Sequence, residues 1–62
     1  MSESYEVKRL GLILAVQAEI EGMKATNAMH LHYETPPTNL EEHFIGKAEE
    51  IRDIVHMHDH QL

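Results

Sequence analysis

Small residues recur at helical spacing through the first half of the chain. Spacings of 4, 3, 4 and 3 separate Gly11, Ala15, Ala18, Gly22 and Ala25. This rhythm is typical of a helix that packs against another helix, and residues with almost no side chain let the second backbone come close. We call these five residues the small-residue row. The row predicts a first helix with a contact face of its own.

The same helix carries large apolar residues on another side. At about 100° per residue, Ile13, Val16 and Ile20 form a second face roughly 150° from the small-residue row. Leu10 and Leu14 lie on the arc between the two faces. A helix with two contact faces needs more than one neighbour, and 62 residues offer only one other helix. All these residues are therefore candidates for helix–helix contacts, within the chain or with a second copy.

Local signals place the start of the first helix near the N-terminus. Ser2 or Ser4 can act as its N-cap, and Glu3 suits the positive end of the helix dipole. No proline interrupts the stretch that follows. We expect the first helix over about residues 4–29.

A proline pair separates the two helices. The segment Thr35-Pro36-Pro37 cannot continue a helix, because proline lacks a backbone donor and restricts the residue before it. We therefore expect a connection over about residues 30–38. Thr38 and Glu41 then have the spacing of a capping box, which predicts a second helix over about residues 39–57.

The second helix is expected to carry a single apolar stripe. Its members recur every three or four residues: Leu40, Phe44, Ala48, Ile51, Val55 and His58, with Ile54 beside them. We expect this stripe to face the large apolar residues of the first helix. Two helices joined by a short connection normally lie antiparallel. The predicted fold class is an all-α antiparallel two-helix hairpin that assembles into a four-helix bundle or a larger oligomer.

Length and composition favour association as a source of stability. A domain of this size is marginal alone, and disulfides, a metal ion or oligomerisation usually support it. The chain contains no cysteine, which excludes disulfides and thiolate metal sites. We therefore expect a homodimer or a higher homo-oligomer.

Charge and hydropathy restrict the partners and the location. Eleven acidic residues oppose five basic ones, for a formal net charge of −6, and the lack of a basic patch disfavours nucleic-acid binding. No apolar run is long enough to span a membrane, and the N-terminal residues are acidic where a signal peptide is basic. Together with the absence of cysteine, these features predict a cytoplasmic protein.

Histidines near the C-terminus form the one candidate metal site. If the second helix continued, His56 and His60 would share a face, and Asp53 would lie close by. Two imidazoles and a carboxylate can hold zinc or another divalent ion. Equally, imidazoles suit the negative end of a helix without any ligand. The alternative to an interaction module is thus a small His-based metal-binding helical protein.

No motif predicts catalysis or a cofactor. The three glycines, Gly11, Gly22 and Gly46, are isolated in predicted helices and do not form a phosphate-binding loop. The chain also lacks a recognisable arrangement of nucleophile and base. We therefore expect a protein that is not an enzyme.

Several segments resemble a group of phage proteins. The resemblance covers about two thirds of the chain. It comprises AVQAEIEGMKATN at residues 15–27, a loop with Tyr33, and Phe44 followed by GKAEEIRDI at residues 46–54. They resemble short proteins of tailed phages, nearest in size and layout to the small early proteins of the lambdoid exo–xis region. The resemblance implies a non-enzymatic helical-hairpin accessory protein that helps redirect the infected cell toward phage development. It also implies an unidentified host or phage protein as partner, and it supplies no catalytic or ligand residues.

Overall fold

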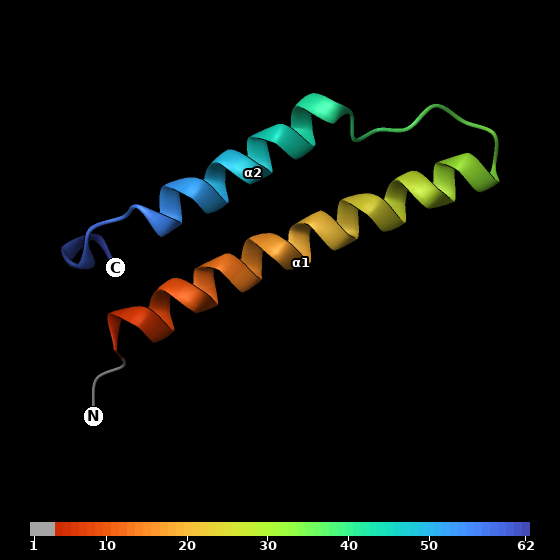
Figure 1. Cartoon of the computed structure of the whole chain (residues 1–62). Coiled ribbons are helices and arrows are strands. Elements are labelled where there is room, and N and C mark those ends of the chain that lie inside the picture. The colour runs from red at the N-terminus through yellow and green to blue at the C-terminus, as the bar shows by residue number, and fades with distance from the viewer. Residues whose placement is uncertain (1–3) are drawn as a thin grey trace.

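The computed structural model describes residues 4–62, which form two long helices lying side by side and antiparallel (Figure 1). Helix α1 spans Tyr5–His32, helix α2 spans Glu41–Val55, and a short 3₁₀ helix, η1, spans Asp59–Gln61. Residues 4–62 contain no strand. The prediction of an all-α fold with two helices in contact is confirmed.

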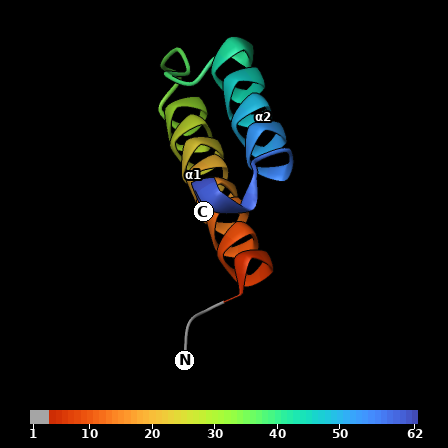
Figure 2. The same ribbon diagram turned by 90° about the vertical axis from the view of Figure 1, so that its left-hand side faces the viewer.

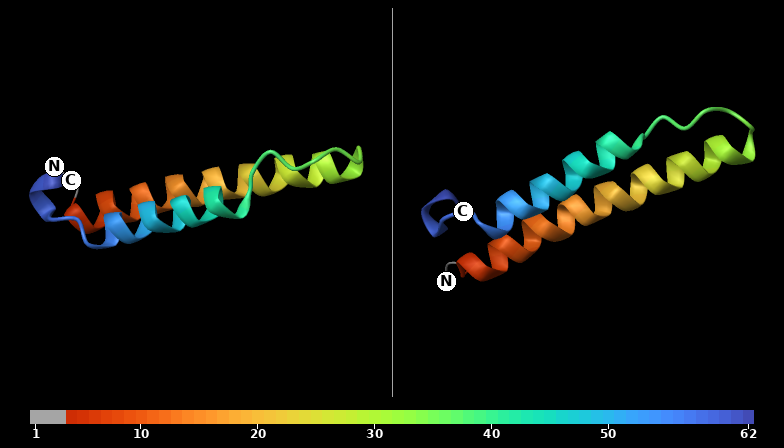
Figure 3. Two further views of the ribbon diagram at one scale, coloured as in Figure 1. Left: turned by 90° about the horizontal axis from the view of Figure 1, so that it is seen from above. Right: turned by 45° about the horizontal axis from the view of Figure 1, so that its top comes forward.

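The hairpin is a single layer of two helices. Its principal extents are 49 × 23 × 10 Å, and the smallest equals about one helix diameter. Two views in Figure 3 show the layer from above and obliquely, with nothing stacked on it. Among the described residues, only Val16 and Ile54 are buried hydrophobics, each 8 % exposed. A layer this thin leaves most apolar side chains open on both of its faces.

Helix α1 is bounded by two local motifs. The Ser4 hydroxyl accepts a hydrogen bond from the Val7 N–H at 3.1 Å, while Ser2 and Glu3 lie outside the described residues. At the other end, the N–H groups of Glu34 and Thr35 donate to the carbonyls of Leu31 and His30. These two bonds form a Schellman motif, with Glu34 at the left-handed position. The motif extends α1 to His32, beyond the predicted limit at about residue 29.

The connection returns along α1 before α2 begins. The Asn27 side chain bonds the backbone of Asn39 twice, and the Asn39 amide donates to the Met23 carbonyl at 3.2 Å. These contacts hold Asn39 against α1. Leu40 is therefore the N-cap residue of α2, and its N–H donates to Nδ1 of His43 at 2.9 Å. The predicted capping box of Thr38 and Glu41 is wrong, because Asn39 is bound to α1.

The stripe that α2 turns toward α1 agrees with the predicted one at Phe44, Ile51 and Ile54 and differs from it elsewhere. Ile54 is buried, whereas Val55 is 51 % exposed and Leu40 is 48 % exposed. The half-buried positions of α2 are Phe44, Gly46, Lys47 and Ile51. Lys47 thus takes the position facing α1 that the apolar pattern assigned to Ala48. Lysine suits this position because its aliphatic stem covers apolar surface while its ammonium group reaches acidic partners.

The C-terminal segment is tied to the start of α1. Arg9 donates to the carbonyls of Ile54, at 3.2 Å, and Met57, and forms an ion pair with Asp59 at 3.2 Å. Helix α2 therefore ends at Val55, two residues before the predicted end, with Arg9 of the other helix bound to one carbonyl inside α2 and one just after it. Figure 2 shows the segment after α2 crossing beside α1.

Candidate interaction surface

The large apolar residues of α1 are used within the chain. Val16 is buried, and Ile13 and Ile20 are half-buried. All three lie on the side of α1 that faces α2, together with Met23. Of the predicted interface residues, these three stabilise the hairpin itself and do not form its outer surface.

The opposite side of α1 carries a continuous apolar row. Its members are Val7, Gly11, Leu14, Ala18, Gly22, Ala25 and Met29, and every one is exposed. We call this the outward row. It shares four members with the small-residue row, and Leu10 and Ala15 flank it. The large side chains project into solvent, since Val7 is 56 %, Leu14 is 57 % and Met29 is 53 % exposed.

Within residues 4–62, no side chain packs against the two glycines of the outward row. A Cβ added to Gly11 or Gly22 would meet no atom within 4 Å outside the neighbouring helix backbone. Glycine in a helix interior costs about 1 kcal/mol relative to alanine. Packing within the described hairpin therefore gives no reason for glycine at either position, whereas a second backbone pressed against this side would.

The C-terminal segment borders the outward row at one end. Leu62 lies beside Val7, Lys8, Gly11 and Leu12, where it lines a shallow open hollow. The space beside Gly11 remains free. The outward row is thus accessible along its length, with the C-terminus at its rim.

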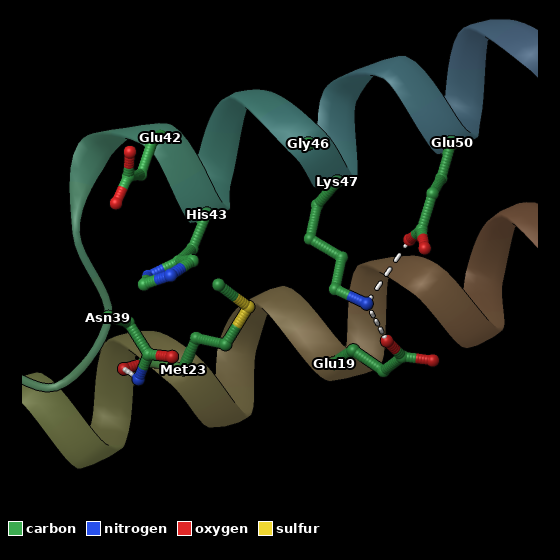
Figure 4. Close-up of a pocket in the computed structure, with 8 residues that line it drawn as sticks. All are labelled: Glu19, Met23, Asn39, Glu42, His43, Gly46, Lys47 and Glu50. Carbon is green, nitrogen blue, oxygen red and sulfur yellow. Dashed lines mark hydrogen bonds and ion pairs between the residues drawn. The ribbon is translucent and has the colours of Figure 1, made fainter.

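A second hollow lies between the helices. It is an open groove of about 560 Å³, shown in Figure 4 with its lining side chains. Lys47 points from α2 toward Glu19 of α1 and is also paired with Glu50, 3.2 Å away. The hydrogen bond to Glu19, followed by that to Glu50, raises the pKa of Lys47 above its ordinary value of 10.5. These three charges neutralise one another in part and join the two helices.

The predicted metal ligands are not brought together. Helix α2 ends before His56, which becomes its C-cap residue, while His60 lies in η1 and Asp53 is exposed on α2. Throughout residues 4–62, no three His, Asp or Glu side chains are grouped closely enough to hold a metal ion. His56 and His60 do not share a helical face, because α2 ends at Val55, where Arg9 binds the carbonyls of Ile54 and Met57. Instead, the rings of His58 and His60 stack with centroids 5.7 Å apart.

The polar contacts that join the helices were missed by reasoning from the sequence. Asn27, Arg9 and Lys47 each fall in a helical pattern as ordinary polar residues. A partial signal existed for Arg9 and Asn27, because at about 100° per residue both fall on the Ile13–Val16–Ile20 side of the first helix. A polar residue within an apolar helix face needs a hydrogen-bonding partner across the contact.

Neither helix of residues 4–62 combines the length and the apolar character that a bilayer crossing requires.

Comparison of the chain with protein-family models, with curated proteins and with solved structures found no significant match.

Proposed function

We propose that this protein is a non-enzymatic protein–protein interaction module that associates with itself through the outward row of α1. The observation that carries the proposal is the pairing of a very small core with an open apolar face. Only Val16 and Ile54 are buried among residues 4–62, while the whole outward row is exposed. Small domains with so little core usually depend on added support, and a second copy would supply it.

The position of the outward row shapes the proposed assembly. The row lies on the side of α1 away from α2, so two hairpins that share it would place their α1 helices in the middle. The four helices would then form one row instead of the compact four-helix bundle that the sequence pattern suggested. The outer side of each α2 would remain free for a further partner.

A regulatory role in phage development is the second part of the proposal. It rests on the resemblance of residues 15–27 and 46–54 to small phage accessory proteins. In that setting the protein would act in the cytoplasm of the infected cell on a host or phage protein. Affinity capture from infected and uninfected cells tests this part. The control is a variant altered on the outer side of α2, the surface proposed to remain free for the partner.

Sedimentation equilibrium tests the self-association. We expect a dimer or larger species whose mass is unchanged by EDTA or by added zinc. Ala18→Leu and Ala15→Leu should weaken assembly by overpacking, typically by about 1–3 kcal/mol. Ala48→Leu, at an exposed site on α2, is the matched control. A monomer at every concentration, or unchanged mass in both α1 variants, would contradict the proposal, and assembly that needs zinc would favour the metal-binding alternative.

A further inference from the structure

The spacing of the outward row is the same in both directions along α1. Its spacings are 4, 3, 4, 4, 3 and 4, which are symmetric about Ala18. If a second α1 runs antiparallel with Ala18 facing Ala18, then each member of the row meets another member. Leu14 then faces Gly22, Gly11 faces Ala25, and Val7 faces Met29.

In this pairing Leu14 and Gly22 complement one another in size, while Val7 meets Met29 and Gly11 meets Ala25. Leu14, which is more than half exposed, would lie over Gly22, whose outer side is open. Leucine against glycine fills the space between two close backbones without overlap. A parallel pair in register would instead place Leu14 on Leu14 and Gly22 on Gly22, with a bulge at one level and a gap at the other.

The row is also straight enough to keep two helices in contact. Its members repeat every 11 residues, from Val7 to Ala18 to Met29 and from Gly11 to Gly22. This repeat corresponds to about 3.67 residues per turn, close to an undistorted α-helix. Two α1 helices can therefore touch along the whole row with little supercoiling.

The size of the outward surface fits a second α1. From Val7 to Met29 the helix rises about 33 Å, and with a diameter of about 10–12 Å its outward half presents on the order of 600 Å². Stable interfaces take roughly 600–1,000 Å² from each partner, so the outward surface alone reaches about the lower limit of this range. A second helix of equal length covers the row from end to end, and the nearby C-terminal segment can supply further contact.

We infer that α1 of one copy packs antiparallel against α1 of a second copy, with Ala18 at the two-fold axis and Leu14 of each copy over Gly22 of the other. This inference rests on the proposed self-association and adds its direction and register. A two-fold contact of this kind uses the same surface on both copies and closes at two chains.

Disulfide trapping tests the direction, because the natural chain contains no cysteine. The Val7→Cys and Met29→Cys variants are mixed and oxidised gently, with an Ile45→Cys variant as control, since Ile45 is exposed on α2. We expect the mixed 7–29 disulfide to form on the order of a hundredfold faster than the control disulfide, because association holds the two thiols at a high effective concentration. The Val7→Cys variant alone should trap poorly, since its two copies would lie about 33 Å apart.

A size exchange tests the register. Gly22→Leu should raise the dimer dissociation constant about tenfold or more by overpacking against Leu14 of the other copy. The double variant Leu14→Gly and Gly22→Leu should restore it, because each new leucine meets a new glycine. Circular dichroism of each variant checks that the hairpin remains helical.

The outcomes separate the inference from the proposed function. A dimer in which Val7→Cys traps itself, or in which the size exchange fails to restore association, would overturn the antiparallel register and leave self-association standing. A monomer by sedimentation, or preferential trapping of Ile45→Cys, would overturn both.

Discussion

The side-chain amide of Asn27 forms two hydrogen bonds with the backbone of Asn39. Its Nδ2 donates to the Asn39 carbonyl at 2.8 Å, and its Oδ1 accepts from the Asn39 N–H at 3.0 Å. One side chain thus satisfies both backbone groups of a residue twelve positions later. This contact turns the connection back along α1 and decides where α2 can begin.

Asn27→Ala should therefore lower the free energy of unfolding by about 1–3 kcal/mol, since it leaves two part-buried backbone groups without partners. Asn27→Asp keeps the acceptor for the Asn39 N–H but sets a carboxylate oxygen against the Asn39 carbonyl, so it should not restore the lost stability. Chemical denaturation followed by circular dichroism, at one protein concentration, measures both variants. Glu49→Ala, at an exposed site, is the control. Equal stability of Asn27→Ala and the control would contradict a structural role for this contact.

Removal of the Arg9 side chain should loosen the end of α2. Arg9 is 22 % exposed and binds two carbonyls and Asp59. Hydrogen bonds of charged groups contribute about 1.5–3 kcal/mol, so Arg9→Ala should destabilise the hairpin by about that amount. Amide hydrogen exchange over residues 56–62 should accelerate, which Arg52→Ala on exposed α2 surface should not cause. Unchanged exchange in this segment would show that Arg9 does not hold it.

Glu34→Gly should stabilise the protein. Glu34 has φ +58°, in the left-handed region, which costs an L-residue roughly 1–2 kcal/mol but costs glycine nothing. The greater freedom of glycine in the unfolded chain offsets part of this gain, so we expect an increase of up to about 1 kcal/mol in the free energy of unfolding. Glu34→Ala, which keeps the strain, should not stabilise. Thermal unfolding compares them, and a glycine variant no more stable than the alanine variant would contradict the prediction.

Deprotonation of Lys47 should lower the free energy of unfolding at high pH. Its pKa is raised in the folded state by Glu19 and, to a lesser degree, Glu50. The stabilisation is thus fully present below the unfolded value of 10.5 and is lost as the pH rises through the folded value. Lys47→Met should reduce the loss of stability above about pH 10.5, measured by urea denaturation. Lys24→Met is the control, because Lys24 forms an exposed ion pair with Glu21. Equal pH dependence of stability in both variants would argue against a stabilising role for the Lys47–Glu19 ion pair.

Mild acid should promote association. The formal net charge is −6 with all six histidines neutral, and histidine gains its proton in mildly acidic solution. Protonation of all six would bring the formal charge to zero and remove the repulsion between copies. Light scattering should increase from about pH 8 to about pH 5 and change less in high salt, which screens the repulsion. Scattering that stays flat over this range would count against the prediction.

Local sequence signals predicted the elements of the fold. The periodicity of apolar residues in each half of the chain, the break at Thr35-Pro36-Pro37 and the Ser4 cap are properties of neighbouring residues. They indicate two helices and a connection without knowledge of any tertiary contact. The two apolar faces of α1 were also visible, because at about 100° per residue they separate clearly around the helix.

The tertiary structure decided how those elements meet. Lys47, not Ala48, faces α1, because Glu19 of the other helix receives its ammonium. Thr38 does not cap α2, because Asn27 binds Asn39, and His56 and His60 do not share a face, because Arg9 ends the helix at Val55. Each outcome depends on a contact between residues distant in the chain. Such contacts leave at most a partial signal in the sequence, such as the place of Arg9 and Asn27 on an apolar helix face, because the partner across the contact is not part of the local pattern.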